Sequence, residues 1–219
     1  TDQLTGELIR ETGEDVKEGG YSILRGSLSA GDNYEIHFTS ANLSIQPAPL
    51  TVTVSAEDKE YDGTQAAAVV ISDNRVQGDE LTISYASSLF GDKNAGTNKT
   101  VTVSGITVEG TDAGNYSVND IATDLAEIFA KELVIGLTAE AKEYDGNTSA
   151  NTSAFISSGL VDGDAIEVSS ANGQFDTKDV GDPKTVTADV SITGGTDQFN
   201  YWSNAAAEAT SSITAKALV

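Results

Sequence analysis

Carboxylates recur in turn-forming stretches of the sequence. Asp112 and Asp197 each lie three residues before an Asn-Tyr pair, and further aspartates repeat at Asp62 and Asp145 and at Asp79 and Asp164. Calcium in proteins binds six to eight oxygen ligands, and loop carboxylates commonly supply them. No DxDxDG loop is present. We therefore hold Ca2+ at Asp112 and Asp197 as a hypothesis beside the simpler interpretation of a solvated acidic surface, and we expect no other cofactor.

Catalysis finds little support in the residue types. The chain has one histidine, His37, within the strand-like stretch "YEIHF", and it has no cysteine. A Ser-His-Asp set needs its members held together in one site, and neither repeat described below supplies such a set. We expect no enzymatic activity, and we expect His37 to lie at a surface or rim.

Three aromatic residues cluster in "QFNYW", residues 198–202, which includes the only tryptophan. Exposed aromatic rings supply binding energy at interfaces, so Trp202 is a candidate contact for a glycan or receptor. The alternative follows from strand alternation, which would direct Phe199 and Tyr201 into the core and leave Trp202 at a contact between modules.

The composition limits the partners. The chain carries 34 acidic and 12 basic side chains, a formal net charge of −22. Such a surface repels nucleic-acid phosphates and anionic lipid, so we expect no nucleic-acid binding. No run of about 18 apolar residues is present, so we expect no membrane insertion. Without methionine or a signal-like start, the sequence is expected to be a segment of a longer polypeptide.

The sequence of the elements that would position these residues occurs twice in the chain. "LTVTVSAEDKEYDG" begins at Leu50 and "LVIGLTAEAKEYDG" begins at Leu133, 83 residues later. Beyond the Tyr-Asp-Gly motif the offset becomes 85, as in Asn115-Tyr116 and Asn200-Tyr201, because the second copy has two extra residues between 144 and 163. We therefore predict modules at 50–132 and 133–217, called the first and second repeat below, after a partial module at 1–49. That partial module contains an Asn33-Tyr34 pair, and its Tyr34 lies 16 residues before Leu50.

The local pattern predicts strands. Apolar residues alternate at Leu50 and Val52, at Val101 and Val103, and at 186, 188, 190 and 192, with Gly- and Asp-rich turns between them. We predict an all-β fold of tandem Ig-like antiparallel β-sandwich modules in an elongated array. The stretches 120–132 and 205–217 are predicted to be the last strand of each repeat.

The repeated motifs are predicted to be structural turns and corners. Glycine permits positive φ, the aspartate bonds the backbone ahead of it, and the tyrosine buries its ring with its hydroxyl at the rim. The Asn-Tyr pairs are predicted to form a second anchored corner. The residues assigned to these motifs are Tyr61, Asp62, Gly63, Tyr144, Asp145, Gly146, Asn115, Tyr116, Asn200 and Tyr201.

These motifs resemble a known family. Lys-Glu-Tyr-Asp-Gly, followed by Gly-Asp and by "GDKNAGTNKTVTVSGITVEGTDAGNYSV", resembles the YDG-type domain of bacterial surface proteins, and residues 5–49 resemble the C-terminal part of an MBG domain. The resemblance implies secreted or cell-surface adhesins and haemagglutinin-like exoproteins, in which such modules serve as stalk or spacer. Implied partners are neighbouring modules of the same polypeptide, with a host or environmental glycan or protein as the alternative. Some surface Ig-like modules carry a Lys-Asn isopeptide bond, for which Lys59 and Lys142 with Asn115 and Asn200 are candidates here.

Overall fold

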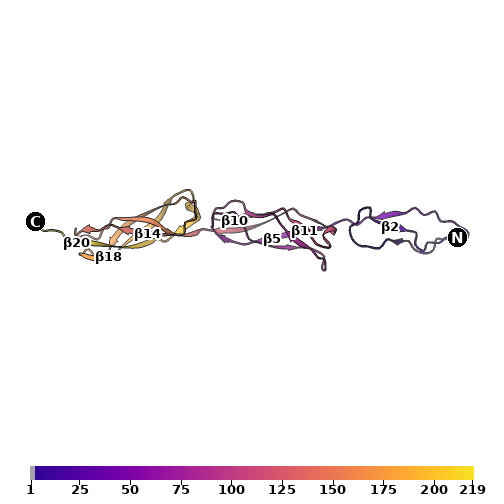
Figure 1. The fold of residues 1–219 in the computed structure, drawn as a ribbon, viewed down its shortest axis with the longest axis horizontal. Helices are drawn as coiled ribbons and strands as arrows, with labels where there is room; N and C mark the ends of the chain where they lie inside the picture. The colour runs from indigo at the N-terminus through magenta and orange to yellow at the C-terminus, as the bar shows by residue number, and fades with distance from the viewer. Residues whose placement is uncertain (1–2) are drawn as a thin grey trace. The chain divides into compact units, whose positions relative to one another are not determined.

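The fold is built from β-strands. The structure, a computed structural model, describes residues 3–219, and regular helix in this range is limited to two single 3₁₀ turns, η1 (Ala113–Asn115) and η2 (Gln198–Asn200). The prediction of an all-β chain is confirmed (Figure 1). Both stretches predicted as last strands are strands, β13 (Ile121–Phe129) and β20 (Ala206–Thr214). No helix among the described residues is long and apolar enough to cross a membrane.

Contacts divide the chain into two compact units. Unit 1 contains residues 1–54, 70–87 and 103–123, and unit 2 contains residues 55–69, 88–102 and 124–219. Residues 1 and 2, which the predicted N-terminal module includes, lie outside the described residues. The division does not follow the sequence repeats, because unit 2 holds segments of the first repeat together with all of the second. The strands that run through a division are β5 (Val52–Ala56), β7 (Val69–Asp73), β9 (Ser87–Phe90), β10 (Gly96–Ser104) and β13.

Unit 1 contains small sheets. β1 (Ile9–Arg10), β2 (Tyr21–Leu24) and β3 (Ala41–Leu43) form an antiparallel three-stranded sheet. β8 (Thr82–Ser84) pairs antiparallel with β11 (Thr107–Glu109). β4 (Ala48–Leu50) pairs in parallel with β12 (Tyr116–Val118), which places Leu50 opposite Val118. The pairing brings the start of the first repeat beside its Asn-Tyr corner.

Unit 2 contains two larger sheets. One has the order β16-β14-β19, and the other has the order β15-β20-β18-β17. β14 pairs antiparallel with β16 and in parallel with β19, with Leu133 opposite Ser203. A short strand of the first repeat, β6 (Lys59–Glu60), pairs in parallel with the end of β13. The remaining bounds are β14 (Lys131–Ala139), β15 (Lys142–Glu143), β16 (Thr152–Ser158), β17 (Glu167–Phe175), β18 (Gly181–Gly194) and β19 (Tyr201–Ser203).

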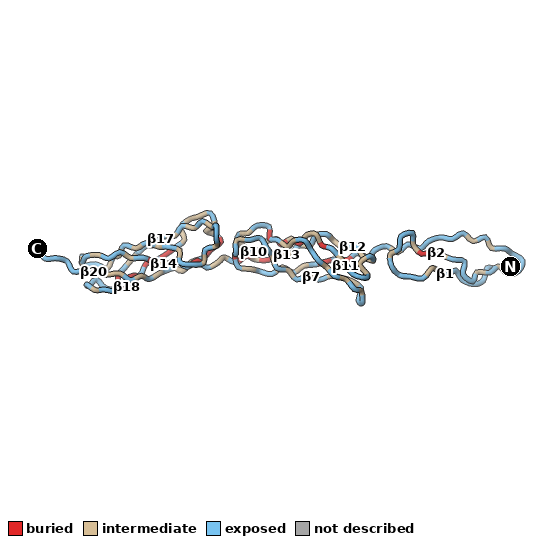
Figure 2. The backbone as a smooth tube through the Cα atoms, in the orientation of Figure 1, coloured by how far each residue is buried: buried red, intermediate tan, exposed pale blue. Residues whose placement is uncertain are grey.

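The core follows the predicted alternation. Val101, Val103 and Val186 are fully buried, whereas Thr102 is half-buried and the two neighbours of Val186 are exposed. Buried positions occur as short segments between half-buried and exposed ones (Figure 2). In unit 2, Ile135 and Leu137 of β14 pack against Ala188 and Val190 of β18. Because these strands belong to different sheets, the contact joins the two sheets of the second repeat by their apolar faces.

Two details of the strand prediction are wrong. Residues 34–38, which include His37, form no strand, although His37 is exposed as predicted. Phe199 is 83% exposed instead of buried, because η2 interrupts the alternation just before β19 while Tyr201 remains 6% exposed.

Candidate functional site

Each Tyr-Asp-Gly motif forms a tight turn. Gly63 and Gly146 have φ of +79° and +84°, a conformation that side chains with a Cβ disfavour. The Asp62 carboxylate accepts hydrogen bonds from the amide and hydroxyl of Thr64, at 2.8 and 2.9 Å. Asp145 accepts from the Asn147 amide at 3.1 Å. The local geometry is that of an Asx turn, as predicted for a structural motif.

A lysine secures each turn. Lys59 Nζ contacts the Asp62 carboxylate at 2.8 Å and lies 5.6 Å from the Phe90 ring centroid. Lys142 repeats this arrangement with Asp145 at 2.9 Å and with the Phe175 ring at 5.6 Å. The Lys142 ammonium and the Asn147 amide hold the pKa of Asp145 below its usual value. Both lysines are thereby engaged at their own turns, whereas the Asn115 and Asn200 side chains bond to residues 15–16 and 94–95.

The Asn-Tyr pairs form corners. Tyr201 Oη donates to Asp164 Oδ2 at 2.7 Å and accepts from the Val161 amide at 2.9 Å. In the first repeat, Tyr116 makes the corresponding bonds to Asp79 and from the Val76 amide. A second carboxylate closes each corner, because Asp197 accepts from the Ala165 amide and Asp112 from the Glu80 amide. We call each set of four side chains a corner: Asp79, Asp112, Asn115 and Tyr116 in the first repeat, and Asp164, Asp197, Asn200 and Tyr201 in the second.

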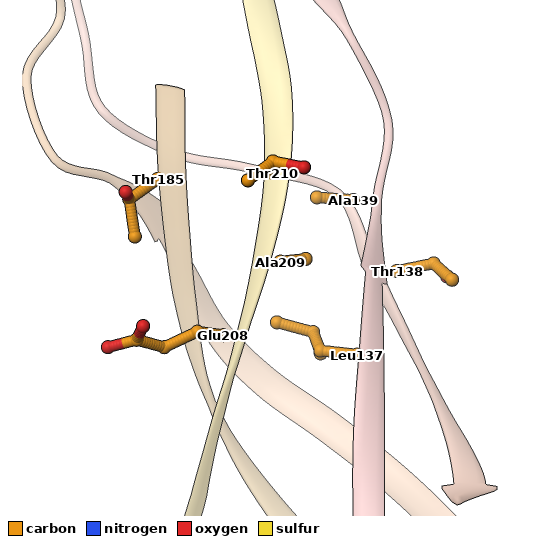
Figure 3. Close-up of a pocket in the computed structure, with 7 residues that line it drawn as sticks. All are labelled: Leu137, Thr138, Ala139, Thr185, Glu208, Ala209 and Thr210. Carbon is orange, nitrogen blue, oxygen red and sulfur yellow. The ribbon is translucent and has the colours of Figure 1, made fainter. Parts of the chain in front are cut away.

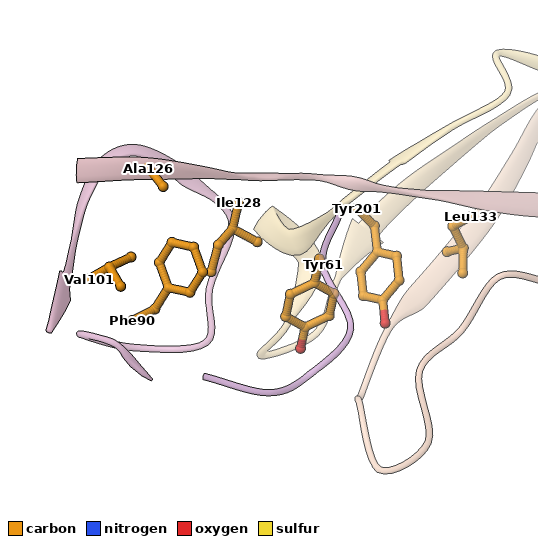
Figure 4. Close-up of a cluster of buried hydrophobic side chains, with 7 residues drawn as sticks. All are labelled: Tyr61, Phe90, Val101, Ala126, Ile128, Leu133 and Tyr201. Atoms are coloured by element: carbon orange, nitrogen blue, oxygen red, sulfur yellow. The ribbon is translucent and has the colours of Figure 1, made fainter. Parts of the chain in front are cut away.

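The corner of the second repeat contacts residues 61 and 93–95 of the first repeat, and we call this contact the junction. All of these residues belong to unit 2. Tyr61 Oη donates to Asp164 Oδ2 at 2.8 Å, so two tyrosine hydroxyls share one carboxylate oxygen. Their rings meet edge to face, with centroids 5.5 Å apart (Figure 4). Such a pair contributes roughly 0.5–1.5 kcal/mol beyond the burial of its area. The Tyr-Asp-Gly turn of the first repeat is therefore an anchoring point for the second repeat.

Lys93 places a positive charge in this junction. Its Nζ lies 3.2 Å from Asp164 Oδ1 and 3.3 Å from Asp197 Oδ1. The Asp164 side chain is only 3% exposed, so the ammonium offsets a carboxylate charge that has lost its water. Contacts with Tyr61, Asp164 and Asp197 raise the pKa of Lys93. The Ala165 amide, the Thr196 hydroxyl and Lys93 lower the pKa of Asp197.

Asn200 completes the junction through the backbone. Its Oδ1 accepts from the Ala95 amide at 2.9 Å, and its Nδ2 lies 3.3 Å from Asn94 Oδ1. We call the three consecutive residues Lys93, Asn94 and Ala95 a strip. The corner therefore contacts the strip through two carboxylates and one side-chain amide group, while Tyr201 and Asp164 contact Tyr61.

Unit 1 contains a similar contact. Asn115 Oδ1 accepts from the Val16 amide at 2.7 Å, and Asn115 Nδ2 donates to Asp15 Oδ1 at 2.9 Å. The strip here is Glu14, Asp15 and Val16, with glutamate at the place of Lys93. A pocket of about 380 Å3 lies at this contact, and its acidic lining consists of Glu14, Asp15, Asp79 and Asp112.

Sequence reasoning missed three participants. Asp164 was recognised as a repeated turn residue, but not as the shared acceptor of two hydroxyls. Lys93 was not singled out, although its recurrence at Lys178 was visible. Asn204 was also missed: it accepts from the Ile135 amide at 2.8 Å and donates to the Ile135 carbonyl at 3.0 Å, as Asn119 does with Val52. The 85-residue spacing of Asn119 and Asn204 was the available signal.

The candidate ligand sites lie in different surroundings. Asp112 and Asp197 each already accept a backbone amide, and residues 3–219 contain no group of three or more His, Cys, Asp or Glu arranged to hold a metal ion. Calcium at these aspartates stays a prediction. Trp202 is 52% exposed and lies opposite Glu132 in the β14–β19 pairing.

A groove lies along the second repeat. It has a volume of about 590 Å3 and is lined by Leu137, Thr138, Ala139, Thr185, Glu208, Ala209 and Thr210 (Figure 3). Glu208 is the one titratable side chain in this lining. The lining offers hydroxyl groups and a single carboxylate, which is no arrangement for nucleophilic or acid–base catalysis.

The strands and the repeated motifs define the class of protein, which is an all-β protein built from tandem modules. Each module carries a Tyr-Asp-Gly turn and a corner of two aspartates, one asparagine and one tyrosine. Comparison with protein families gives the family. The YDG domain matches residues 46–123 and 130–211, and the chain belongs to the YDG domain family. No curated protein and no solved structure matches the chain.

Proposed function

We propose that this chain is a spacer segment of a large secreted or surface-anchored bacterial adhesin, presenting a binding region located elsewhere. The observation that carries the proposal is the use of the recurring polar residues. Tyr61 and Lys93 contact Asp164, and Asn200 bonds to Ala95, so these polar side chains join residues of the two repeats at the junction. Residues that bind one module to the next serve a function in which spacing and orientation matter.

Three finer assignments belong to this proposal. The sheets of each repeat would form Ig-like sandwiches, which the packing of β14 against β18 supports. The modules would be 50–132 and 133–217, preceded by an MBG-like part at 1–49. The acidic charge of −22 suits an extracellular, self-repelling segment that binds no nucleic acid.

The length of a spacer should be variable without loss of binding by the domain that it presents. The chain can be placed between a bacterial surface anchor and a small antigen-binding domain, with residues 133–217 deleted, present once or present twice. We expect antigen capture from solution to be equal in all three, while capture of antigen-coated beads across a grafted polymer layer increases with the number of repeats. Equal bead capture by all three chains would contradict the proposal.

The second candidate is a glycan- or receptor-binding module. The observation in its favour is the exposure of Phe199 at 83% and Trp202 at 52%, close together in sequence on either side of Tyr201. A glycan array probed with the chain and with Trp202→Ala tests it, with Phe155→Ala as a control because Phe155 is an exposed aromatic of β16. Binding that is lost in Trp202→Ala alone would establish this function instead of the spacer.

A further inference from the structure

The second repeat carries its own copy of the surface that the first repeat uses at the junction. Tyr144 and Gly146 occupy the places of Tyr61 and Gly63, and the strip is Lys178, Asp179 and Val180. Lys178 Nζ lies 5.8 Å from the Tyr144 ring centroid, the distance that also separates Lys93 from the Tyr61 ring. Lys93 and Lys178 thus lie in the same way against the tyrosine of the Tyr-Asp-Gly turn in their own repeat.

This second surface is open. Val180 is 54% exposed, and among the described residues no carboxylate lies within ion-pair distance of Lys178. Its hydrogen bond within residues 3–219 goes to the Tyr144 hydroxyl at 3.4 Å. A Cβ at Gly146 would meet no atom within 4 Å, whereas one at Gly63 would lie 2.9 Å from Val161 of the second repeat.

We propose that the surface formed by Tyr144, Gly146 and the strip 178–180 is a docking site for the corner of another YDG module. This inference rests on the proposed spacer function, since it names the partner of the spacer. The incoming aspartates, at the places of Asp164 and Asp197, would pair with Lys178. The incoming asparagine would accept a hydrogen bond from the Val180 amide, and the first aspartate would also accept one from Tyr144.

The strip sequence is compatible with such a corner. Asp179 stands where the unit 2 junction has Asn94, and Val180 stands where it has Ala95. The unit 1 contact already uses this combination, because Asp15 accepts from Asn115 Nδ2 and the Val16 amide donates to Asn115 Oδ1. Lys178 retains the positive charge found at Lys93. The lysine, the aspartate and the valine of this strip therefore each match a residue that contacts a corner from the same strip position elsewhere in the chain.

The charges favour this occupant. A corner brings two carboxylates to the strip, and Lys178 is the cation that can offset them. A partner presenting lysine or arginine at the same place would oppose Lys178. The proposed docking site therefore favours a corner, which each YDG repeat of this chain carries.

The test uses an extended chain in which residues 133–219 are appended after residue 217, so that a second copy of the corner follows the strip. Amide hydrogen exchange is measured by NMR at Val180, with Ala95 as the internal reference for a docked strip. We expect the Val180 amide to exchange at least about 100-fold more slowly in the extended chain than in the original chain. Asn200→Ala made in the appended copy alone, or Lys178→Glu, should remove most of this protection.

A second variant keeps the inference testable if the appended copy does not fold. Asn94→Asp combined with Ala95→Val places the strip of the second repeat in the existing junction. We expect the amide at position 95 to stay as protected as in the original chain and the melting temperature to change by less than about 2 °C. Unprotected Val180 in a folded extended chain, or lost protection at position 95, would overturn the inference. These readouts report docking alone, so they remain informative if the bead-capture test of the spacer function fails.

Discussion

Lys93 is the residue through which the charge of the unit 2 junction can be tested. Lys93→Glu would place a third carboxylate beside Asp164, which is almost fully buried, and beside Asp197. We expect a clear fall in the urea midpoint because the almost fully buried Asp164 charge loses its cation, and the 40% exposure of the Lys93 side chain to water limits the loss. The measurement is urea unfolding followed by circular dichroism.

Lys178→Glu is the matched control, with the same change of charge at the equivalent repeat position. Since no carboxylate in the described part of the chain pairs with Lys178, we expect a loss below about 0.5 kcal/mol. Equal losses in the two variants would show that general charge, rather than the junction, governs the effect of Lys93→Glu.

Tyr61 and the two corner tyrosines predict a response to alkaline pH. Burial and the Asp164 carboxylate raise the pKa of Tyr61 and Tyr201, and the bond to Asp79 raises the pKa of Tyr116. A raised pKa in the folded state contributes stability that is fully present below the unfolded value of about 10 and is lost as pH rises beyond it. We expect the melting temperature to fall as pH rises from about 9.5 to 11.5.

The tyrosinate absorbance gives an independent measurement. The tyrosines at positions 61, 116 and 201 should ionise above the usual tyrosine pKa of about 10. Tyr201→Phe should remove one of these late protons and destabilise the chain, because the Val161 amide and Asp164 each lose a partner. A single common ionisation of all tyrosines near pH ~10 would contradict the assignment.

At the scale of elements, the two Tyr-Asp-Gly turns form a natural comparison. Both glycines have positive φ, so an alanine at either position costs about 1 kcal/mol in backbone strain. At Gly63 the new methyl group would also approach Val161 Cγ1 at 2.9 Å, whereas at Gly146 it would enter open space. We expect Gly63→Ala to cost about twice as much as Gly146→Ala in thermal unfolding, and equal costs would argue against the contact.

Strand β14 shows why some elements follow from sequence and others do not. The recurrence of the Leu50 stretch at Leu133 predicted the start of the second repeat, and β14 buries Leu133, Ile135 and Leu137 on one face. The register shift between Val134 and Ile135 was not predictable, because it depends on Asn204, 69 residues away, taking over both backbone groups of Ile135.

The junction shows the same limit. Turn chemistry within a few residues predicted the positive φ of Gly63 and the Asx turn at Asp62. The bond from Tyr61 to Asp164 spans 103 residues and requires two modules to be folded at once. Local patterns carry no information about such a contact, apart from the repetition of each partner at a fixed spacing.

At the scale of the whole molecule, charge governs the expected response to salt. A net charge of −22 makes self-repulsion a destabilising contribution in every folded part of the chain. Screening is already strong at 0.15 M ionic strength, where the Debye length is about 8 Å. We expect the melting temperature to rise with NaCl and to gain little from millimolar calcium afterwards, as differential scanning calorimetry can measure.

A specific calcium site would behave differently. It would raise stability with the logarithm of free calcium even in high salt, and magnesium would not reproduce the effect. A rise of several degrees from calcium in about 0.3 M NaCl would overturn the expectation of screening alone. Asp112→Asn and Asp197→Asn would then be the first variants to make, because these carboxylates close the two corners.

The parallel pairing at the end of each repeat has a mechanical consequence. In the second repeat, β15 follows β14 near the entry of the chain, and it pairs in parallel with the last strand β20, with Lys142 opposite Ile213 and Glu143 opposite Thr214. β6 and β13 show the same pairing at Lys59 and Glu60. Tension applied at the two ends of a repeat pulls parallel neighbours in opposite directions along their length. The hydrogen bonds between them are then loaded together in shear instead of being opened one after another, so we expect these short strand pairs to resist extension.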